Sequence, residues 1–236
     1  MNPQAFRFKQ FSVDDSKCAM KVGTDAVILG AWVNLDNADT ILDIGTGCGV
    51  IALMIAQRSK AIITAIDIDE SASIQSNENF LASPWNERLV TVHGAVQELN
   101  TENHFDLIVC NPPFFKNALK APDRQRNIAR HNDELSFESL LVSVDRLLNN
   151  CGTFAFILPN DEAQQVITIA AAHQLYPNRC CNIISRDGKS PNRLLIQLCR
   201  KESVIERETL KIRDQNNQYT FQYKELTKDF YLFLSE

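Results

Sequence analysis

The sequence predicts an α/β fold in which a mostly parallel sheet carries helices on both faces and ends in antiparallel strands. Three observations support this prediction. From Thr40 onward, short apolar runs alternate with longer helical stretches, an order typical of parallel strands joined by right-handed crossovers. A glycine cluster stands where the first strand should pass into a helix, a common position for a ligand-binding turn. After Arg179 the helical pattern stops, and two apolar runs are joined by a loop that contains glycine and proline.

The residues before this alternating region predict a short, lid-like N-terminal segment, which we call the preface. Residues 6–13 alternate apolar and polar side chains as a half-buried strand does, and residues 18–22 are expected to return as a second strand. A helix is expected over residues 24–32, with Thr24 or Asp25 as its cap. The preface therefore predicts a hairpin followed by a helix.

The remaining elements follow from the same patterns. Core strands are predicted over residues 41–44, 62–66, 89–92, 107–110 and 153–158. Helices are predicted over residues 50–58, 70–81, 137–148 and 161–173. The end of the chain predicts antiparallel strands at 181–184 and 194–198, followed by a tail with the stretches 210–213 and 219–221 and a short helix near 223–228. We interpret residues 1–236 as a single domain with a preface (1–35), a catalytic core (36–200) and a C-terminal extension (201–236).

The composition restricts the class of protein. The 236 residues are 44% apolar and 22% charged, which is typical of a soluble globular domain. No apolar run approaches the ~20 residues that cross a bilayer, and the first residues lack the plan of a secretory signal. The seven cysteines form no CxxC pair, which favours reduced thiols in a cytoplasmic protein without a metal site. A net charge of −5 argues against a protein that coats nucleic acid nonspecifically.

The glycine cluster predicts a cofactor site. Gly45, Gly47 and Gly49 follow the first core strand at alternate positions, and Asp43 precedes them. The dinucleotide fingerprint would place its last glycine at position 50, where this chain has Val50. A pyrophosphate would be repelled by Asp43, whereas a sulfonium and an ammonium would be attracted by it. The sequence therefore favours S-adenosyl-L-methionine over NAD, with a ligand-free turn as the alternative.

Two further loops are expected to complete this pocket. Asp67 ends the second predicted strand, where a carboxylate can bind both ribose hydroxyls, and Ile68 can lie on the adenine. Ala95 and Val96 follow the third strand and are expected near the adenine edge. Asp69 is interpreted as the cap of the next helix rather than as a ligand.

The stretch Asn111-Pro112-Pro113-Phe114 follows the fourth predicted strand. Proline removes a backbone donor and restricts the residue before it, so the carbonyl groups here are not easily absorbed into regular structure. The amide oxygen of Asn111 and the carbonyl of Pro112 can both accept from one amino group, while Phe114 offers a face for stacking. The alternative is a strand-ending turn in which Phe114 fills the core.

These motifs resemble those of class I methyltransferases that modify planar amino groups. The resemblance implies a Rossmann-like, seven-stranded sheet whose last strands are antiparallel. Outside the shared core, residues 8–11, 20–25, 130–137 and 226–232 resemble the bacterial tRNA adenine-N6 methyltransferases, which modify the adenine beside the anticodon of a valine tRNA. The family resemblance implies a tRNA substrate and no obligate protein or membrane partner.

The resemblance also implies roles for individual residues. Lys21, Gly23 and Thr24 belong to a stretch expected to close over the methionine end of the cofactor. Asn111, Pro112 and Phe114 are the expected catalytic residues, with Phe114 stacked on an adenine swung out of the anticodon loop. Residues 116–130 carry a charge balance of +4 and residues 179–201 one of +5, although such runs are often solvated loops. The first run supplies the candidate substrate contacts Lys116, Arg124, Arg126 and Arg130, and His131, directly after it, is the remaining candidate.

Other functions remain open from the residues alone. Similar motifs serve methylation of guanine N2 in ribosomal RNA, adenine N6 in DNA and glutamine N5 in proteins. The short preface argues against the ribosomal RNA enzymes, and the lack of a large recognition domain argues against the DNA enzymes. A cofactor-binding RNA factor without catalysis is a further alternative, against which the intact Asn111 and Phe114 argue.

Overall fold

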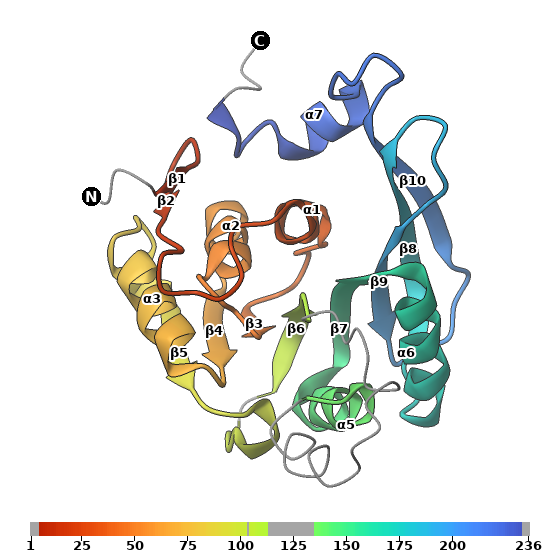
Figure 1. Cartoon of the computed structure of the whole chain (residues 1–236). Helices are drawn as coiled ribbons and strands as arrows, with labels where there is room; N and C mark the ends of the chain where they lie inside the picture. The colour runs from red at the N-terminus through yellow and green to blue at the C-terminus, as the bar shows by residue number, and fades with distance from the viewer. Residues whose placement is uncertain (1–4, 103, 113–134, 233–236) are drawn as a thin grey trace, which may run out of the picture.

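The computed structural model describes residues 5–102, 104–112 and 135–232. Eight strands form one sheet in the order β10-β8-β9-β7-β6-β3-β4-β5 (Figure 1). Their bounds are β3 Thr40–Ile44, β4 Ile62–Asp67, β5 Leu89–His93, β6 Phe105–Cys110, β7 Leu148–Leu158, β8 Tyr176–Arg186, β9 Arg193–Cys199 and β10 Glu206–Arg213. The helices are α1 Thr24–Trp32, α2 Val50–Arg58, α3 Glu70–Leu81, α5 Phe137–Leu147, α6 Asn160–Ala172 and α7 Phe221–Thr227.

Helices cover both faces of the sheet, as the alternating pattern predicts. Side chains from α1, α2, α3 and α7 pack in one apolar cluster, and those from α5 and α6 pack in the other (Figure 1). The central strands supply both clusters in turn: Leu107 and Val109 of β6 face the first, Ile108 and Cys110 the second. Because neighbouring residues of a strand point to opposite faces, a continuous apolar run indicates burial on both sides.

The sheet has one strand more than the resemblance implies. β9 alone runs against the others, since it pairs antiparallel with both β7 and β8. β10, Glu206–Arg213, then pairs parallel with β8 along most of its length. This strand includes the tail stretch 210–213, and its pairing satisfies the backbone groups that β8 would otherwise expose at the sheet edge.

The N-terminal prediction was wrong in detail. A tight turn divides residues 6–13, so that β1 (Phe6–Arg7) pairs antiparallel with β2 (Ser12–Val13). Phe8 instead forms a bridge with Tyr231 and stacks on Phe11, which places the first and last described segments side by side (Figure 1). Residues 18–22 form no strand, and the Val22 amide donates its hydrogen bond to Oδ2 of Asp15 at 3.0 Å instead. Packing among the aromatic rings therefore outweighs the alternating pattern.

Three boundaries also differ from the predictions. Gly23 is the N-cap of α1, and neither Thr24 nor Asp25 makes a side-chain cap. Residues 149–152, expected to end a helix, belong to the first part of β7. The helix expected near 223–228 begins at Phe221, because Oγ1 of Thr220 accepts the Tyr223 amide and caps α7. In each case a tertiary contact, or a competing cap, decides between two locally acceptable conformations.

The cysteines are all free in this structure, so no disulfide joins its elements. Among the described residues, no helix combines the length and apolarity that a membrane span requires. In the same part of the chain, no group of three or more His, Cys, Asp or Glu side chains is arranged to hold a metal ion.

Candidate active site

Three adjacent strands end at the same level of the sheet. Ile44 of β3 is in register with Ile66 of β4 and with Cys110 of β6. Asp67 follows Ile66, and Asn111 follows Cys110, so both side chains emerge at the edge where the glycine loop begins. Open parallel sheets bind their ligands at this carboxyl edge. The structure thus brings together the acid and the amide that the sequence places 44 residues apart.

The loop after β3 leaves open space beside two of its glycines. Gly45 and Gly47 have φ values of 68° and 56°, and a Cβ built on either would meet no atom within 4 Å. Gly49 is different, because its Cβ would lie 2.4 Å from Cε1 of Phe80. With φ of 81°, Gly49 also adopts a left-handed conformation that L side chains rarely take. Phe80 therefore packs against the glycine loop at Gly49. The space beside Gly45 and Gly47 stays accessible to a ligand.

Asp43 lies beneath this loop and has no exposed surface. Thr46 donates a hydrogen bond of 2.7 Å to its Oδ2, and its Oδ1 finds no partner among the described residues. Burial raises the pKa of Asp43 to about 7, and the charge of Asp67 adds to this effect, whereas the Thr46 hydrogen bond opposes it. Asp43 can therefore act on a ligand above the loop through its charge and by fixing Thr46.

Asp67 joins the glycine loop to the next helix. Its Oδ2 accepts the Gly47 amide at 2.8 Å, and its Oδ1 accepts the Asp69 amide at 3.0 Å. The Asp69 side chain in turn accepts the Ser71 amide and caps α3, as the sequence predicts. Each Asp67 oxygen therefore already holds one donor, and an oxygen can accept a second one from a ligand.

The residues expected around an adenine differ in exposure. Ile68 is 57% exposed, and its carbonyl lies 3.2 Å from Nε2 of His93 at the end of β5. Ala95 is half-buried, just before the turn η2 (Val96–Glu98). The Val96 side chain is buried in the apolar cluster beneath α5, so only its backbone can face a ligand.

The preface supplies the other wall of this region. Lys21 donates to the Asp15 carbonyl at 2.6 Å, and Gly23 and Thr24 begin α1 at the same edge of the sheet. Asp25 forms an ion pair with Arg193 of β9 at 3.0 Å. The three preface candidates are therefore near one another in the fold, with Lys21 held by a partner within the preface.

Sequence reasoning missed Asn79, which connects the preface to the glycine loop. Its Nδ2 donates 2.8 Å hydrogen bonds to the carbonyls of Cys48 and Asp14, and its Oδ1 accepts the Asp14 amide at 3.0 Å. Gln75, one turn earlier, accepts the Lys17 amide. The sequence offers no signal for this role, because two polar residues four positions apart on a helix also suit an exposed face, and only the structure shows that Gln75 and Asn79 are buried.

At the end of β6, Asn111 is half-buried and Pro112 is buried. The other candidates of this stretch lie outside the described residues: Phe114, Lys116, Arg124, Arg126, Arg130 and His131. Their roles stay predictions. The described part of the site thus consists of the glycine loop, Asp67, the η2 turn and Asn111-Pro112.

Comparisons with known proteins agree with this geometry. Residues 18–137 match the family model described as the methyltransferase small domain. A curated protein of Bacteroides thetaiotaomicron, named tRNA1(Val) (adenine(37)-N6)-methyltransferase, is 46% identical over 97% of this chain and 98% of its own length. A protein of Tolumonas auensis with the same name is 41% identical over the whole of both chains.

A solved structure supports the fold independently. A predicted O-methyltransferase from Agrobacterium tumefaciens superposes with a TM-score of 0.69, covering 87% of this chain and 96% of its own at 18% identity. At that identity the likeness shows the Rossmann-like class I methyltransferase fold alone. Identity above 40% over nearly the full length is what decides the family. The chain belongs to the tRNA1(Val) (adenine(37)-N6)-methyltransferase family.

Proposed function

We propose that this protein transfers a methyl group from S-adenosyl-L-methionine to N6 of adenine 37, beside the anticodon of tRNA1(Val). The observation that carries the proposal is the common edge at which the glycine loop, Asp67 and Asn111 meet. The full-length identity to enzymes named for this reaction supports the substrate. A tRNA substrate in turn favours a cytoplasmic location.

The residues of the pocket fit the cofactor. Bound S-adenosyl-L-methionine supplies a methyl group activated by a sulfonium. Gly45 and Gly47 leave space for a ligand against the backbone, and Asp67 can accept hydrogen bonds from ribose hydroxyls. The buried Asp43 places a potential negative charge, with one oxygen lacking a partner, under the same loop. These features favour a cationic ligand over a pyrophosphate.

Asn111 and Pro112 are proposed to position the amino group of adenine. The amide oxygen of Asn111 and the carbonyl of Pro112 can accept the two N–H bonds of N6, which turns the nitrogen lone pair toward the methyl group. The ring delocalises this lone pair in the free base, so holding the nitrogen out of conjugation lowers the barrier. After transfer the methylated nitrogen carries a positive charge and loses one proton to water, so no strong general base is required. Phe114 is proposed to stack on the base.

The test is methyl transfer by the purified chain with a tritiated cofactor. We expect label in a tRNA1(Val) transcript, none when adenine 37 is changed to guanine, and none in ribosomal RNA. Mapping of the modified nucleotide by mass spectrometry should place the methyl on N6 of adenine 37. Activity of the purified chain alone would also show that no protein partner is needed.

The variant Asn111→Ala separates positioning from cofactor binding. We expect transfer to be lost while calorimetry gives an unchanged affinity for the cofactor. Transfer at the parent rate would refute the role of Asn111, and label in ribosomal RNA instead of tRNA would refute the substrate.

A further inference from the structure

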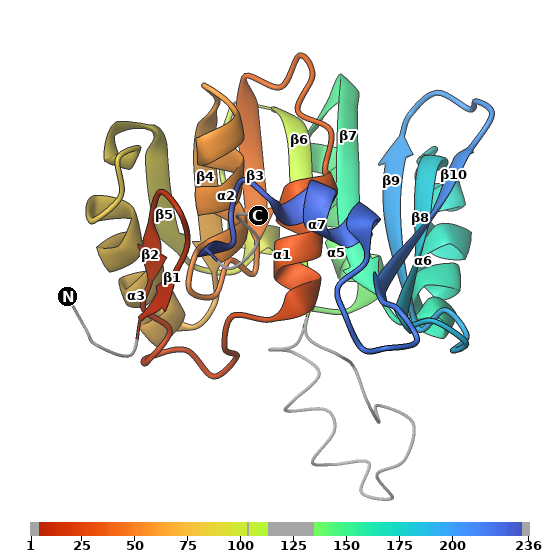
Figure 2. The ribbon, with the colours of Figure 1, turned by 90° about the horizontal axis from the view of Figure 1, so that it is seen from above.

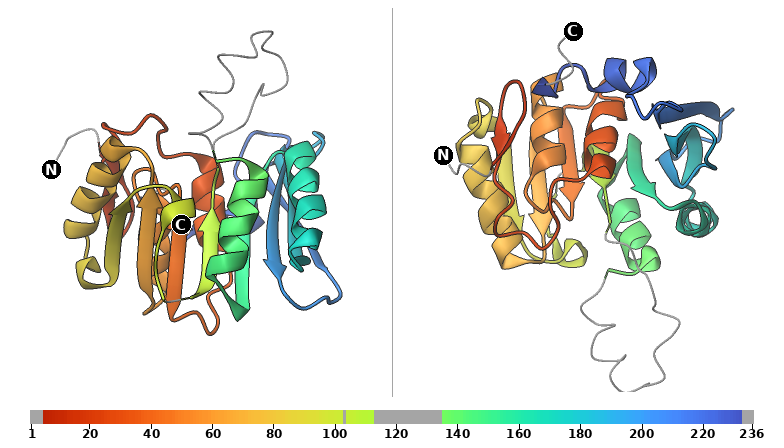
Figure 3. Two further views of the ribbon diagram at one scale, coloured as in Figure 1. Left: turned by 90° about the horizontal axis from the view of Figure 1, so that it is seen from below. Right: turned by 45° about the horizontal axis from the view of Figure 1, so that its top comes forward.

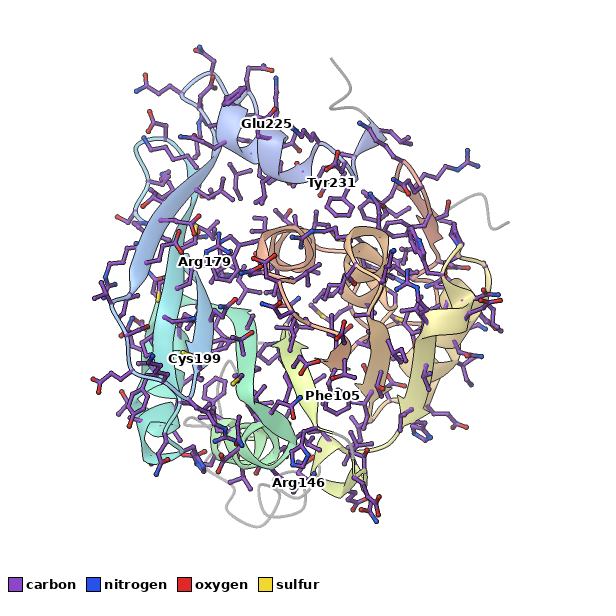
Figure 4. The ribbon with its side chains drawn as sticks, turned by 180° about the vertical axis from the view of Figure 1, so that it is seen from behind. Phe105, Arg146, Arg179, Cys199, Glu225 and Tyr231 are labelled. Carbon is purple, nitrogen blue, oxygen red and sulfur yellow. The ribbon has the colours of Figure 1, made fainter. Side chains whose placement is uncertain are left out.

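The basic run at residues 179–201 divides into two groups in the structure. Arg179 pairs with Glu208 at 2.6 Å and lies over the Trp32 ring, between the edge strands and α1 (Figure 4). Arg200 pairs with Asp145 at 2.6 Å, and Arg193 pairs with Asp25. These three arginines hold elements of the fold together. Among the described residues, Arg186, Lys189 and Lys201 form no ion pair.

Arg186 ends β8, Lys189 lies in the turn that follows it, and β10 adds a third cation beside them. Arg213 ends β10 and lies over the Tyr219 ring, with its guanidinium carbon 4.0 Å from the ring centre. Its Nη1 donates to the Asn217 carbonyl at 2.7 Å, so no carboxylate neutralises it within the described part of the chain. We define Arg186, Lys189 and Arg213 as the edge cluster.

The two turns that carry the edge cluster are fixed to each other. Nη2 of Arg186 donates to the Gln215 carbonyl at 2.7 Å, and the Asp187 amide donates to the Arg213 carbonyl at 2.8 Å. The two turns also carry two carboxylates: Asp187 accepts Lys211 at 2.6 Å and the Gln215 side chain at 3.1 Å, and Oδ1 of Asp214 accepts the Gln218 amide at 2.9 Å. The hydrogen bond from Lys211 and that from Gln215 hold the pKa of Asp187 below its usual value. Two of the three cations are thus held in place by backbone carbonyls, and within the described part of the chain none of the three forms an ion pair.

The edge cluster lies on the same side of the molecule as the candidate active site. The turns after β8 and β10 are at the carboxyl edge, like the ends of β3, β4 and β6 (Figure 2 and Figure 3). Three strand spacings separate β6 from β8 and four separate it from β10, or about 15 to 20 Å at ~4.8 Å per spacing. A few nucleotides of RNA span that distance.

Charge also limits the direction from which a polyanion can approach the edge cluster. A cavity beside Arg193 is lined by Asp161 and Glu162 at the start of α6, which repel phosphate. A second cavity of about 310 Å³ lies on the other side of Arg193, between α1, the two turns and α7, and is lined by Arg213, Tyr219 and Ser185. A polyanion would therefore meet the edge cluster from the side of α1 and α7.

We propose that the edge cluster binds backbone phosphates of the tRNA substrate while its anticodon loop occupies the site at Asn111. This inference rests on the proposed function, because it takes tRNA as the polyanion. Lysine and arginine contacts with phosphate fix the register of a nucleic acid without reading its bases. The edge cluster would thus contribute affinity and orientation, while base recognition stays at Asn111.

The test compares charge removal at the two edges of the sheet. The edge variant combines Arg186→Gln, Lys189→Gln and Arg213→Gln. Its control removes the same charge from exposed residues near the amino edge, with Lys60→Gln, Lys201→Gln and Arg207→Gln. Binding of a tRNA1(Val) transcript is measured by filter retention between 50 and 300 mM salt, together with kcat and KM for methyl transfer.

Removal of each cation that binds a phosphate should weaken binding about tenfold at 0.1 M salt and reduce the salt slope by about 1. We expect the edge variant to lose about two to three units of slope and to raise KM for tRNA with kcat nearly unchanged. The control should bind like the parent. Equal losses in both variants, or none in the edge variant, would overturn the proposal.

The single variant Lys189→Gln separates the loss of a phosphate contact from an effect of misfolding. Among the described residues, the Lys189 side chain makes no hydrogen bond or ion pair, so its removal cannot act through the fold. It should reduce the salt slope by about 1 and leave the affinity for S-adenosyl-L-methionine unchanged. If the parent protein methylates tRNA but this variant and the edge variant behave like the parent, the proposal fails while the function stands. If the parent methylates no tRNA, the function itself fails.

Discussion

The Gly47 amide donates a 2.8 Å hydrogen bond to Oδ2 of Asp67. One carboxylate at the end of β4 therefore fixes the loop that follows β3 and still faces the place proposed for a ribose. Binding of the cofactor and the shape of its loop depend on the same side chain.

Asp67→Ala should weaken binding of S-adenosyl-L-methionine by about 10- to 100-fold, because hydrogen bonds to a charged group contribute about 1.5 to 3 kcal/mol. Calorimetry measures this affinity directly. Asp69→Ser is the matched control, since serine can keep the cap of α3, and its affinity should equal that of the parent. An unchanged affinity in Asp67→Ala would exclude the carboxylate from the cofactor site.

Asn79→Leu should destabilise the protein by about 2 to 3 kcal/mol, because it removes three hydrogen bonds that the Asn79 amide makes with the backbone of Asp14 and Cys48. It should also raise KM for the cofactor, since the preface and the glycine loop lose their common anchor. Urea denaturation and steady-state kinetics measure the two effects. Asn77→Leu, the same change at an exposed position of α3, should change stability by less than about 0.5 kcal/mol. If KM for the cofactor in Asn79→Leu equals that of the parent, Asn79 has a purely structural role.

Gly49→Ala should be more destabilising than Gly45→Ala. Both positions have positive φ, which costs an alanine about 1 to 2 kcal/mol, but only at Gly49 would the new Cβ collide with Phe80. Overpacking adds about 1 to 3 kcal/mol there. Thermal denaturation of both variants measures the difference. Adding Phe80→Leu should recover part of the loss in Gly49→Ala, and strictly additive effects would contradict the proposed collision.

Asp43 should make both stability and cofactor binding depend on pH. Burial raises its pKa to about 7 in the folded chain, above the value near 4 of an unfolded one. The folded state therefore holds the proton more tightly, and stability declines as the pH rises through the window from about 4 to 7. Denaturation at several pH values should show that Asp43→Asn removes this decline.

The pH dependence of cofactor binding has the opposite sign to that of stability. A cationic ligand favours the ionised carboxylate, so the affinity of the parent for S-adenosyl-L-methionine should increase as the pH rises toward 8. Calorimetry in two buffers of different ionisation enthalpy should detect proton release near pH 6. The Asp43→Asn variant should release no proton, and equal release by parent and variant would exclude Asp43 as its source.

The sequence alone determined the features that depend on local chemistry. The alternation of apolar runs predicted the parallel core, the glycine spacing predicted the loop at residues 45–49, and Asp69 was correctly predicted to cap α3. Such signals can be read because strand period, left-handed turns and helix caps each demand particular residue types over a few positions.

Tertiary structure decided what depends on partners far along the chain. The aromatic contact of Phe8 with Tyr231 divided a predicted strand, and pairing with β8 brought Glu206–Arg213 into the sheet. Asn79 connects the preface to the loop at Cys48, although neither segment reveals this in sequence. The physical reason is that a hydrogen bond, a stacked ring or an ion pair depends on distance in space, which only the folded chain sets.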